Sequence, residues 1–327
     1  MSTYFKNKKV LVAGGTGMIG IPLVQLLQEQ GAEVRVASMD DSSRCPEGAE
    51  FMKVDMTSED NCIKACKGMD QVFNLLGVKA SPATAKNKPA SHFVTNMLLQ
   101  INLMEAARKC DVEGMLFTSS VGVYPPAQVL KEDDVWEGFP SPNDWYGGWA
   151  KRMGELQMEG YRKEYDWEKL TVVRPTNVYG PWDCFYGEHA MVVPSLIRRA
   201  TESDGELMVW GDGSPKRDFI LARDVADGMI QVAEKNPAEP INLGSGNARS
   251  IKDLVEIVVE CVNPDLELKW DVDKPAGDML RCMDTTRAES YGIFAKTSLE
   301  DGVKETVEWF KTQGVNTCGV HNAYEER

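Results

Sequence analysis

The chain has 327 residues, of which 43% are hydrophobic, so it carries enough apolar material for a large core and too much for a globally disordered protein. Its formal net charge of −14 excludes a basic nucleic-acid-binding surface and disfavours binding to anionic membranes. The three histidines and eight scattered cysteines include no CxxC pair, so we expect no metal site and reduced thiols. The sequence shows neither an apolar signal core nor a membrane-spanning stretch, which predicts a cytoplasmic protein.

Apolar strands alternate with amphipathic helices through the first half of the chain. The patterns predict strands at 9–13, 33–37, 51–54, 71–75 and 114–118, and helices at 18–30 and 91–109. This alternation is typical of a parallel sheet with helices on both faces.

A glycine-rich loop joins the first strand to the first helix. It reads Gly14-Gly15-Thr16-Gly17-Met18-Ile19-Gly20, with glycines spaced GxxGxxG. Glycines permit a tight turn and let the backbone approach a pyrophosphate, which the N-terminus of the following helix attracts. A purely structural turn is the alternative, but the strand–turn–helix context favours a dinucleotide site.

The residues after the second strand bear on the choice between NAD and NADP. Ser38 stands where a carboxylate commonly holds the ribose 2′-hydroxyl, and Asp40 follows within reach. Arg44 could instead face a 2′-phosphate. Carboxylate repulsion favours NAD slightly and leaves NADP open. Asp55, after the third strand, is placed either to meet the adenine or to cap the next helix.

The second half of the chain is less regular. An acidic, proline-rich stretch follows residue 120, and then come a predicted helix at 148–164 and a strand at 170–174. Shorter, mixed segments follow. We therefore predict an α/β protein, with a Rossmann doubly wound parallel sheet over 1–180, a smaller mixed substrate lobe over 181–315 interleaved with it, and a tail over 316–327.

Three further segments complete a family pattern. They are Phe117-Thr118-Ser119-Ser120-Val121-Gly122-Val123-Tyr124, the helix with Tyr146 and Lys151, and Arg174-Pro175-Thr176-Asn177-Val178-Tyr179-Gly180-Pro181. Together with the glycine loop they make the sequence resemble the extended short-chain dehydrogenase/reductases that act on nucleotide sugars, over nearly the whole chain. The segment 209–219 looks most like the GDP-fucose synthase branch of that family.

The resemblance implies hydride transfer between a sugar carbon and nicotinamide, with Tyr146 as general base and Lys151 lowering its pKa. It also implies that Ser120, or its neighbour Ser119, binds the reacting oxygen. The family spaces tyrosine and lysine four residues apart, whereas here five separate them and Gly147 takes the usual tyrosine position. On a regular helix these side chains would stand about 140° apart. Either Tyr146 lies just before the helix, or a π-bulge absorbs one residue, or the catalytic tyrosine is lost.

The same comparison narrows the reaction. Val121-Gly122 stands where related dehydratases carry Asp-Glu. The cysteine and histidine that the GDP-fucose synthase branch uses for epimerisation are absent at Gly122 and Met191, and His189, two residues before Met191, is left as a partial substitute for the histidine. The resemblance therefore implies 4-epimerisation through a transient 4-keto sugar. A nucleotide-sugar 4-ketoreductase or dehydrogenase and a non-catalytic NAD(P)-binding protein are the alternatives.

The resemblance also implies binding residues and an assembly. The cofactor set adds Met56, Leu75, Lys151, Pro175, Asn177 and Val178 to the glycine loop. The nucleotide-diphosphate sugar would meet Asn177, Val193, Arg217 and Arg281, with the two arginines on the diphosphate. Relatives dimerise through two helices per subunit, here 91–109 and 148–164, which implies a homodimer.

Overall fold

The computed structural model describes residues 3–78, 87–187, 190–273 and 279–313. The larger lobe is built on a seven-stranded sheet in which every neighbouring pair of strands is parallel. Its strands are β1 (Lys9–Ala13), β2 (Glu33–Ser38), β3 (Glu50–Lys53), β4 (Gln71–Asn74), β5 (Gly114–Thr118), β7 (Leu170–Pro175) and β11 (Ile241–Leu243), in the order β11-β7-β5-β4-β1-β2-β3. The chain reverses direction across the sheet between β1 and β4, which is where such sheets bind dinucleotides.

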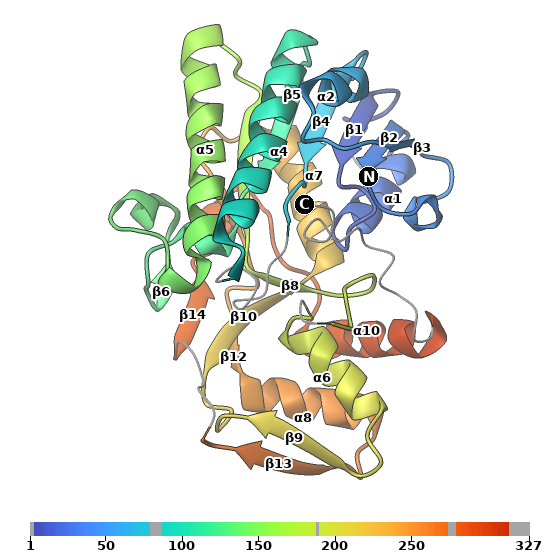
Figure 1. The fold of residues 1–327 in the computed structure, drawn as a ribbon, viewed down its shortest axis with the longest axis vertical. Helices are drawn as coiled ribbons and strands as arrows, with labels where there is room; N and C mark the ends of the chain where they lie inside the picture. Colours follow the sequence, from blue (N-terminus) through green and yellow to red (C-terminus); the bar gives the residue numbers. More distant parts are fainter. Residues whose placement is uncertain (1–2, 79–86, 188–189, 274–278, 314–327) are drawn as a thin grey trace.

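Alternating side chains of β1 separate two cores. Val10 and Val12 face a cluster that includes residues of α1 (Gly20–Glu29) and α7 (Ala222–Lys235), and Leu11 and Ala13 face the opposite cluster. That second side is covered by α2 (Glu59–Cys66), α4 (Pro89–Lys109) and α5 (Trp145–Tyr165), with α4 and α5 running side by side (Figure 1). The predicted Rossmann fold with helices on both faces is confirmed.

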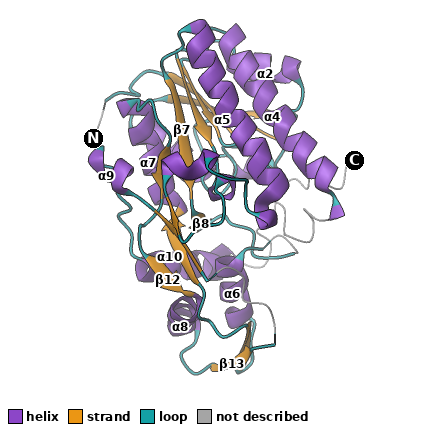
Figure 2. Ribbon diagram, turned by 90° about the vertical axis from the view of Figure 1, so that its left-hand side faces the viewer, coloured by secondary structure: helices purple, strands orange, loops and turns teal. Residues whose placement is uncertain are grey.

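The smaller lobe lies at one end of the large sheet, below it in Figures 1 and 2. A mixed sheet runs β12 (Ala248–Ser250), β10 (Lys216–Leu221), β14 (Leu280–Met283) and β6 (Val129–Leu130), and β8 (Asn177–Tyr179) also pairs with β10. Two further strands, β9 (Glu206–Trp210) and β13 (Glu267–Asp271), pair with each other. The helices α6 (Val192–Thr201), α8 (Ile251–Val262) and α10 (Leu299–Gln313) enclose this lobe's apolar core.

The chain passes between the lobes more than once. Strand β11 comes after residue 181 but pairs in the large sheet, and helix α7, also after residue 181, packs against that sheet. Strand β6 comes before residue 181 but pairs in the small sheet. The predicted tail, 316–327, lies outside the described residues. Within the described ranges, no helix is both long and apolar enough to cross a membrane.

All three predicted helix starts differ from the structure: α1 begins later than predicted, and α4 (at Pro89, not residue 91) and α5 begin earlier. Helix α1 begins at Gly20 and not at residue 18, because the tight glycine turn extends to Ile19. Helix α5 begins at Trp145, three residues before the predicted start. Glycine disfavours helix, but a Cβ on Gly148 would lie 2.3 Å from the carbonyl oxygen of Gly122. Close packing thus requires glycine at this position, and the helix forms despite glycine's low intrinsic propensity.

Candidate active site

The glycine loop lies at the carboxyl end of β1 and is tightly folded. Gly14 has a φ of +84°, and a Cβ on Gly20 would lie 2.3 Å from the carbonyl oxygen of Gly14. No side chain of the described residues caps the N-terminus of α1. A loop this close to the helix, with backbone N–H groups at a positive dipole end, fits the pyrophosphate of a dinucleotide.

The end of β2 is linked to this loop by a small polar cluster. The fully buried Thr16 hydroxyl lies 2.7 Å from Ser38 Oγ and 2.5 Å from Asp40 Oδ2. Any cofactor contact of Thr16 would therefore come from its backbone. The Arg44 guanidinium is also buried, and it donates to the carbonyl oxygens of Thr16 and Trp182. Arg44 thus stands beside the predicted ribose site but is already engaged by backbone groups.

The predicted adenine residues have local structural roles. Asp55 Oδ1 accepts hydrogen bonds from the backbone N–H and the hydroxyl of Thr57, which closes a turn before α2; the N-cap of α2 is Ser58, so the predicted capping role of Asp55 is wrong. Met56 is 2% exposed and packs in the core beneath α2. Leu75 lies nearer the cofactor loop, since its carbonyl is 3.3 Å from where a Cβ of Gly14 would stand.

Lys151 reaches the carboxyl ends of β4 and β5. Its Nζ donates to the carbonyl oxygens of Leu76 at 3.0 Å and Thr118 at 2.8 Å. Burial lowers the pKa of Lys151 to about 8, although the carboxylate of Glu155 acts to raise it. This places an ammonium group at the edge of the sheet where the nicotinamide half of a cofactor would lie.

Two buried polar atoms at these strand ends lack hydrogen-bond partners among the described residues. They are Asn74 Nδ2 on β4 and Thr118 Oγ1 on β5. Buried polar atoms are normally satisfied, so unpaired ones beside the lysine fit a site that is completed by a bound polar group. Together with the glycine loop, they show that the residues present fit a nicotinamide dinucleotide, which would supply or accept the hydride.

The two candidate serines differ in their surroundings. Ser119 is 4% exposed, and its hydroxyl donates to Glu155, which is paired with the buried Arg174. Ser120 is half-buried, and its hydroxyl oxygen accepts from the backbone N–H of Gly122 at 3.1 Å. The Ser120 hydroxyl keeps its own proton for another acceptor, so the structure favours Ser120 over Ser119.

Tyr146 lies inside helix α5, whose described turns are α-helical from Trp145 onward. The expectations that it precedes the helix or that a π-bulge shifts it are therefore both wrong. Its side chain is 40% exposed and stands about 140° from Lys151 around the helix axis. The residue one turn before Lys151 is Gly147. A Cβ on Gly147 would lie 3.0 Å from Nε2 of His92, a residue that the sequence patterns did not single out.

The two predicted diphosphate arginines lie on adjacent strands. Arg217 on β10 is the register partner of Arg281 on β14 and, across β10's other edge, of Arg249 on β12. Register partners project from the same face of a sheet, so these three side chains form an arginine row. Arg281 also donates to the carbonyl oxygen of Val121 at 3.3 Å, next to Ser120. Arg249 was missed because its neighbours in the row are remote in sequence.

The remaining predicted residues differ in their surroundings. Asn177 donates to the carbonyl oxygen of Asp218 at 2.8 Å, on the strand pair β8–β10. Pro175 is buried at the end of β7, and Val178 is half-buried. Val193 is 2% exposed within the core of the smaller lobe, so its side chain supports α6 and does not line a site in this conformation.

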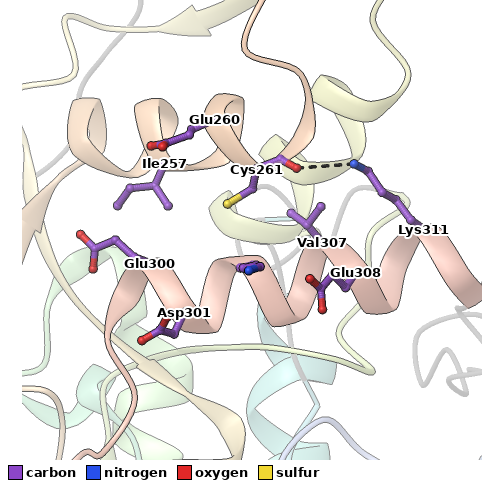
Figure 3. Close-up of a pocket in the computed structure, with 9 residues that line it drawn as sticks. Ile257, Glu260, Cys261, Glu300, Asp301, Val307, Glu308 and Lys311 are labelled. Carbon is purple, nitrogen blue, oxygen red and sulfur yellow. Dashed lines mark hydrogen bonds between the residues drawn. The ribbon is translucent and has the colours of Figure 1, made fainter.

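Two surface hollows differ in charge. The larger, about 550 Å³, lies between α8 and α10 and is lined by the four carboxylates of Glu260, Glu300, Asp301 and Glu308 (Figure 3). Lys304 and Lys311 also line it, but the carboxylates outnumber them and disfavour a diphosphate, and the hollow contains none of the predicted site residues. A smaller hollow of about 250 Å³ includes Arg281 and Tyr124 and borders the segment after Ser120.

Comparison with known proteins gives the same picture of the whole chain. Residues 10–244 match the model of the NAD dependent epimerase/dehydratase family. GDP-L-fucose synthase 1 of Arabidopsis thaliana is 31% identical over 315 residues, covering 93% of this chain and 94% of the relative. GDP-mannose 3,5-epimerase 1 of Oryza sativa subsp. japonica is 28% identical over 335 residues, covering 97% of this chain and 87% of the relative.

A solved structure agrees with this assignment. UDP-glucose 4-epimerase of Thermotoga maritima, solved with UDP-glucose, has a TM-score of 0.83 and 29% identity, over 93% of this chain and 99% of that one. The family model spans well over half of this chain, and the relatives are enzymes whose alignments cover nearly all of it. The non-catalytic alternative is therefore set aside. By its glycine loop, its sheet order and these matches, the protein is an enzyme that belongs to the NAD dependent epimerase/dehydratase family.

Proposed function

We propose that the protein is an NAD(P)-dependent nucleotide-sugar epimerase that oxidises and re-reduces sugar C4 through a transient 4-keto intermediate. The observation that carries this proposal is the Lys151 ammonium, held by two strand-end carbonyl oxygens beside Ser120 and the dinucleotide loop. A cation there stabilises negative charge on a sugar oxygen, and the Ser120 hydroxyl can donate to the same oxygen.

The substrate side of the proposal rests on the arginine row. Three guanidinium groups on adjacent strands offer paired N–H donors to a diphosphate, although Arg249 also pairs with Glu300 and Arg281 with Asp144. Arg281 also lies close to the segment that carries Ser120, so a diphosphate on the row would leave its sugar near the reacting groups. Relatives that act on GDP-sugars and UDP-sugars share this fold, and the nucleotide base is left open.

A nucleotide-sugar 4-ketoreductase is the second candidate. The GDP-L-fucose synthases found as relatives support it, with identities of 31% and 32% over 93% of this chain. Gly122 and Met191 carry no group able to exchange protons at neighbouring sugar carbons. The reductase would therefore reduce C4 without epimerising C3 or C5.

Cofactor retention separates the two candidates. The purified protein is denatured, and released nucleotides are identified by chromatography and mass spectrometry. An epimerase keeps its cofactor through both half-reactions, so stoichiometric NAD supports the first candidate. An empty protein that then binds NADPH reversibly supports the reductase, and a protein that binds neither cofactor contradicts the dinucleotide site itself.

The proposed cofactor preference follows from Asp40. Its carboxylate lies 2.5 Å from the Thr16 hydroxyl at the end of β2, where the adenosine ribose would sit. A 2′-phosphate there would meet a negative charge, while Arg44 is held by two backbone carbonyl oxygens. We therefore favour NAD.

A further inference from the structure

Position 147 lies on the same face of α5 as the half-buried Lys151 but carries no side chain. Gly147 lies one turn before Lys151 on α5, so a side chain there would project along the same face. The adjacent helix fills this space, because His92 Nε2 lies 3.0 Å from the point where a Cβ of residue 147 would stand. His92 is 8% exposed and lies on α4, which packs along α5.

Asn96 contacts His92 on one side and lies beside the backbone of residues 77 and 78 on the other. Its Nδ2 donates to the carbonyl oxygen of His92 at 2.8 Å and lies 3.4 Å from His92 Nδ1. Its Oδ1 accepts from the backbone N–H of Val78. A Cβ on Gly77 would lie 3.5 Å from Asn96 Oδ1 and 3.6 Å from Lys151 Nζ. The Asn96 amide thus contacts His92, and its oxygen and the Lys151 ammonium both lie beside the backbone of Gly77.

The local charges suit a proton acceptor. Burial lowers the pKa of His92 below its usual value, and the carboxylate of Asp144 acts to raise it. Asp144 is itself paired with Arg281 at 3.3 Å, and Lys151 lies one turn beyond Gly147 on α5. The burial effect leaves the imidazole neutral near pH 7, and a neutral imidazole can accept a proton.

We infer that His92 is the catalytic residue that transfers the proton at sugar O4, in place of a tyrosine at position 147. This inference rests on the proposed chemistry at C4. In the oxidative half, the O4–H bond breaks and its proton joins the imidazole, while the C4–H hydride passes to the nicotinamide and a C4 carbonyl forms. The reductive half returns the hydride to C4 and the proton to O4.

Tyr146 is the competing residue, and its position argues against it. It is 40% exposed and lies on a different face of α5 from Lys151, so the ammonium cannot act on its phenol in this conformation. His92 and Gly147 instead form a complementary pair. Helix α5 carries no side chain at position 147, one turn before Lys151, and helix α4 supplies the titratable His92 there.

The test compares full-length variants for conversion of UDP-glucose and of GDP-mannose with NAD, and of a GDP-4-keto sugar with NADPH. Products are separated by anion-exchange chromatography, and cofactor affinity is measured by fluorescence titration. The variants are His92→Gln, which keeps an amide near the Nε2 position but cannot accept a proton, and Tyr146→Phe as the matched control. His92→Ala combined with Gly147→Tyr places a phenol one turn before Lys151.

We expect His92→Gln to lower kcat at least ~100-fold with cofactor affinity unchanged, the usual effect of losing a general acid–base group. Tyr146→Phe retains activity, and the double variant recovers part of it with a pH profile shifted upward. If His92→Gln loses its cooperative melt, His92→Ala with added imidazole replaces it, and restored turnover supports the inference.

Retention of kcat within about threefold by His92→Gln overturns the inference, as does loss of activity in Tyr146→Phe alone. Failure of imidazole to restore activity to a folded His92→Ala also overturns it. A wild-type protein that converts none of the three probes removes the proposed function itself. An active wild type with an active His92→Gln removes only the role of His92.

Discussion

The buried ion pair between Glu155 and Arg174 gives a sharp test of what stabilises the site. Arg174 donates to Glu155 from Nε at 2.9 Å and from Nη2 at 2.6 Å. The side chain of Arg174 is 2% exposed and that of Glu155 is 6% exposed. Arg174 also donates to the hydroxyl of Tyr124 and the carbonyl oxygen of Glu132. The pair therefore joins α5 and β7 to the segment that follows Ser120.

Glu155→Gln keeps the size of the side chain and removes its charge. The amide accepts at one atom only, so it leaves the buried guanidinium without its paired carboxylate, and Glu132 is then the nearby acidic group that remains. Removing one partner of such a pair costs about 3–5 kcal/mol of unfolding free energy, a large part of the roughly 5–15 kcal/mol that stabilises a typical folded protein. Urea denaturation followed by circular dichroism and tryptophan fluorescence measures this loss.

The same helix offers a matched control one turn further on. Glu159 pairs with Lys163, but the side chains are 49% and 73% exposed, and exposed pairs contribute about 0–1 kcal/mol. Glu159→Gln should therefore leave the midpoint nearly unchanged. A Glu155→Gln variant as stable as Glu159→Gln would refute the reasoning, because it would mean that solvent or a neighbouring group compensates the isolated cation.

Three further predictions concern catalysis, the cofactor and assembly. Burial lowers the pKa of Lys151 from 10.5 to about 8, so the ammonium is present below pH 8 and is lost above it. In steady-state assays kcat should therefore fall as pH rises through about 8. Lys151→Met should lower kcat at all pH values. Asp40→Asn removes the carboxylate at the proposed ribose site, so the ratio of NADP affinity to NAD affinity should rise about tenfold in fluorescence titrations. An unchanged ratio would mean that the 2′ position of the cofactor's adenosine ribose lies elsewhere. We propose that the outward faces of α4 and α5 form a homodimer interface, because Val94, Ile101 and Leu156 are 47%, 41% and 49% exposed there. Leu156→Glu should give monomers in light scattering. A wild-type protein that is itself a monomer would contradict the proposed dimer.

The sequence predicted the large sheet well because its signals are local. Strands β1 and β5 have the predicted bounds, since each is a short apolar run ended by glycine or polar residues. The glycine loop was also predictable, because the turn and the helix that follows it are consecutive in the chain. The residues that determine a strand–turn–helix unit of this kind all lie within one short stretch of sequence, so the unit can be predicted without knowledge of the rest of the fold.

The site was less predictable because its partners are distant in sequence. Ser119 and Ser120 are adjacent and chemically identical, and only the fold shows that Ser119 donates to Glu155, 36 residues away. His92 gave no pattern of its own, since its meaning depends on Gly147 in the neighbouring helix. The start of α5 was missed for a related reason: glycines that disfavour a helix locally are required there by close packing.

The interleaving of the two lobes limits how such a protein can change over evolution. The small sheet takes β6 and β8 from chain segments that precede residue 181, while the large sheet takes β11 from the segment that follows it. No single cut in the gene would therefore separate the small sheet from the large one. Recombination at one point would not exchange the small lobe as a unit, so under the proposed function a change of sugar preference is expected from point substitutions and short loop insertions.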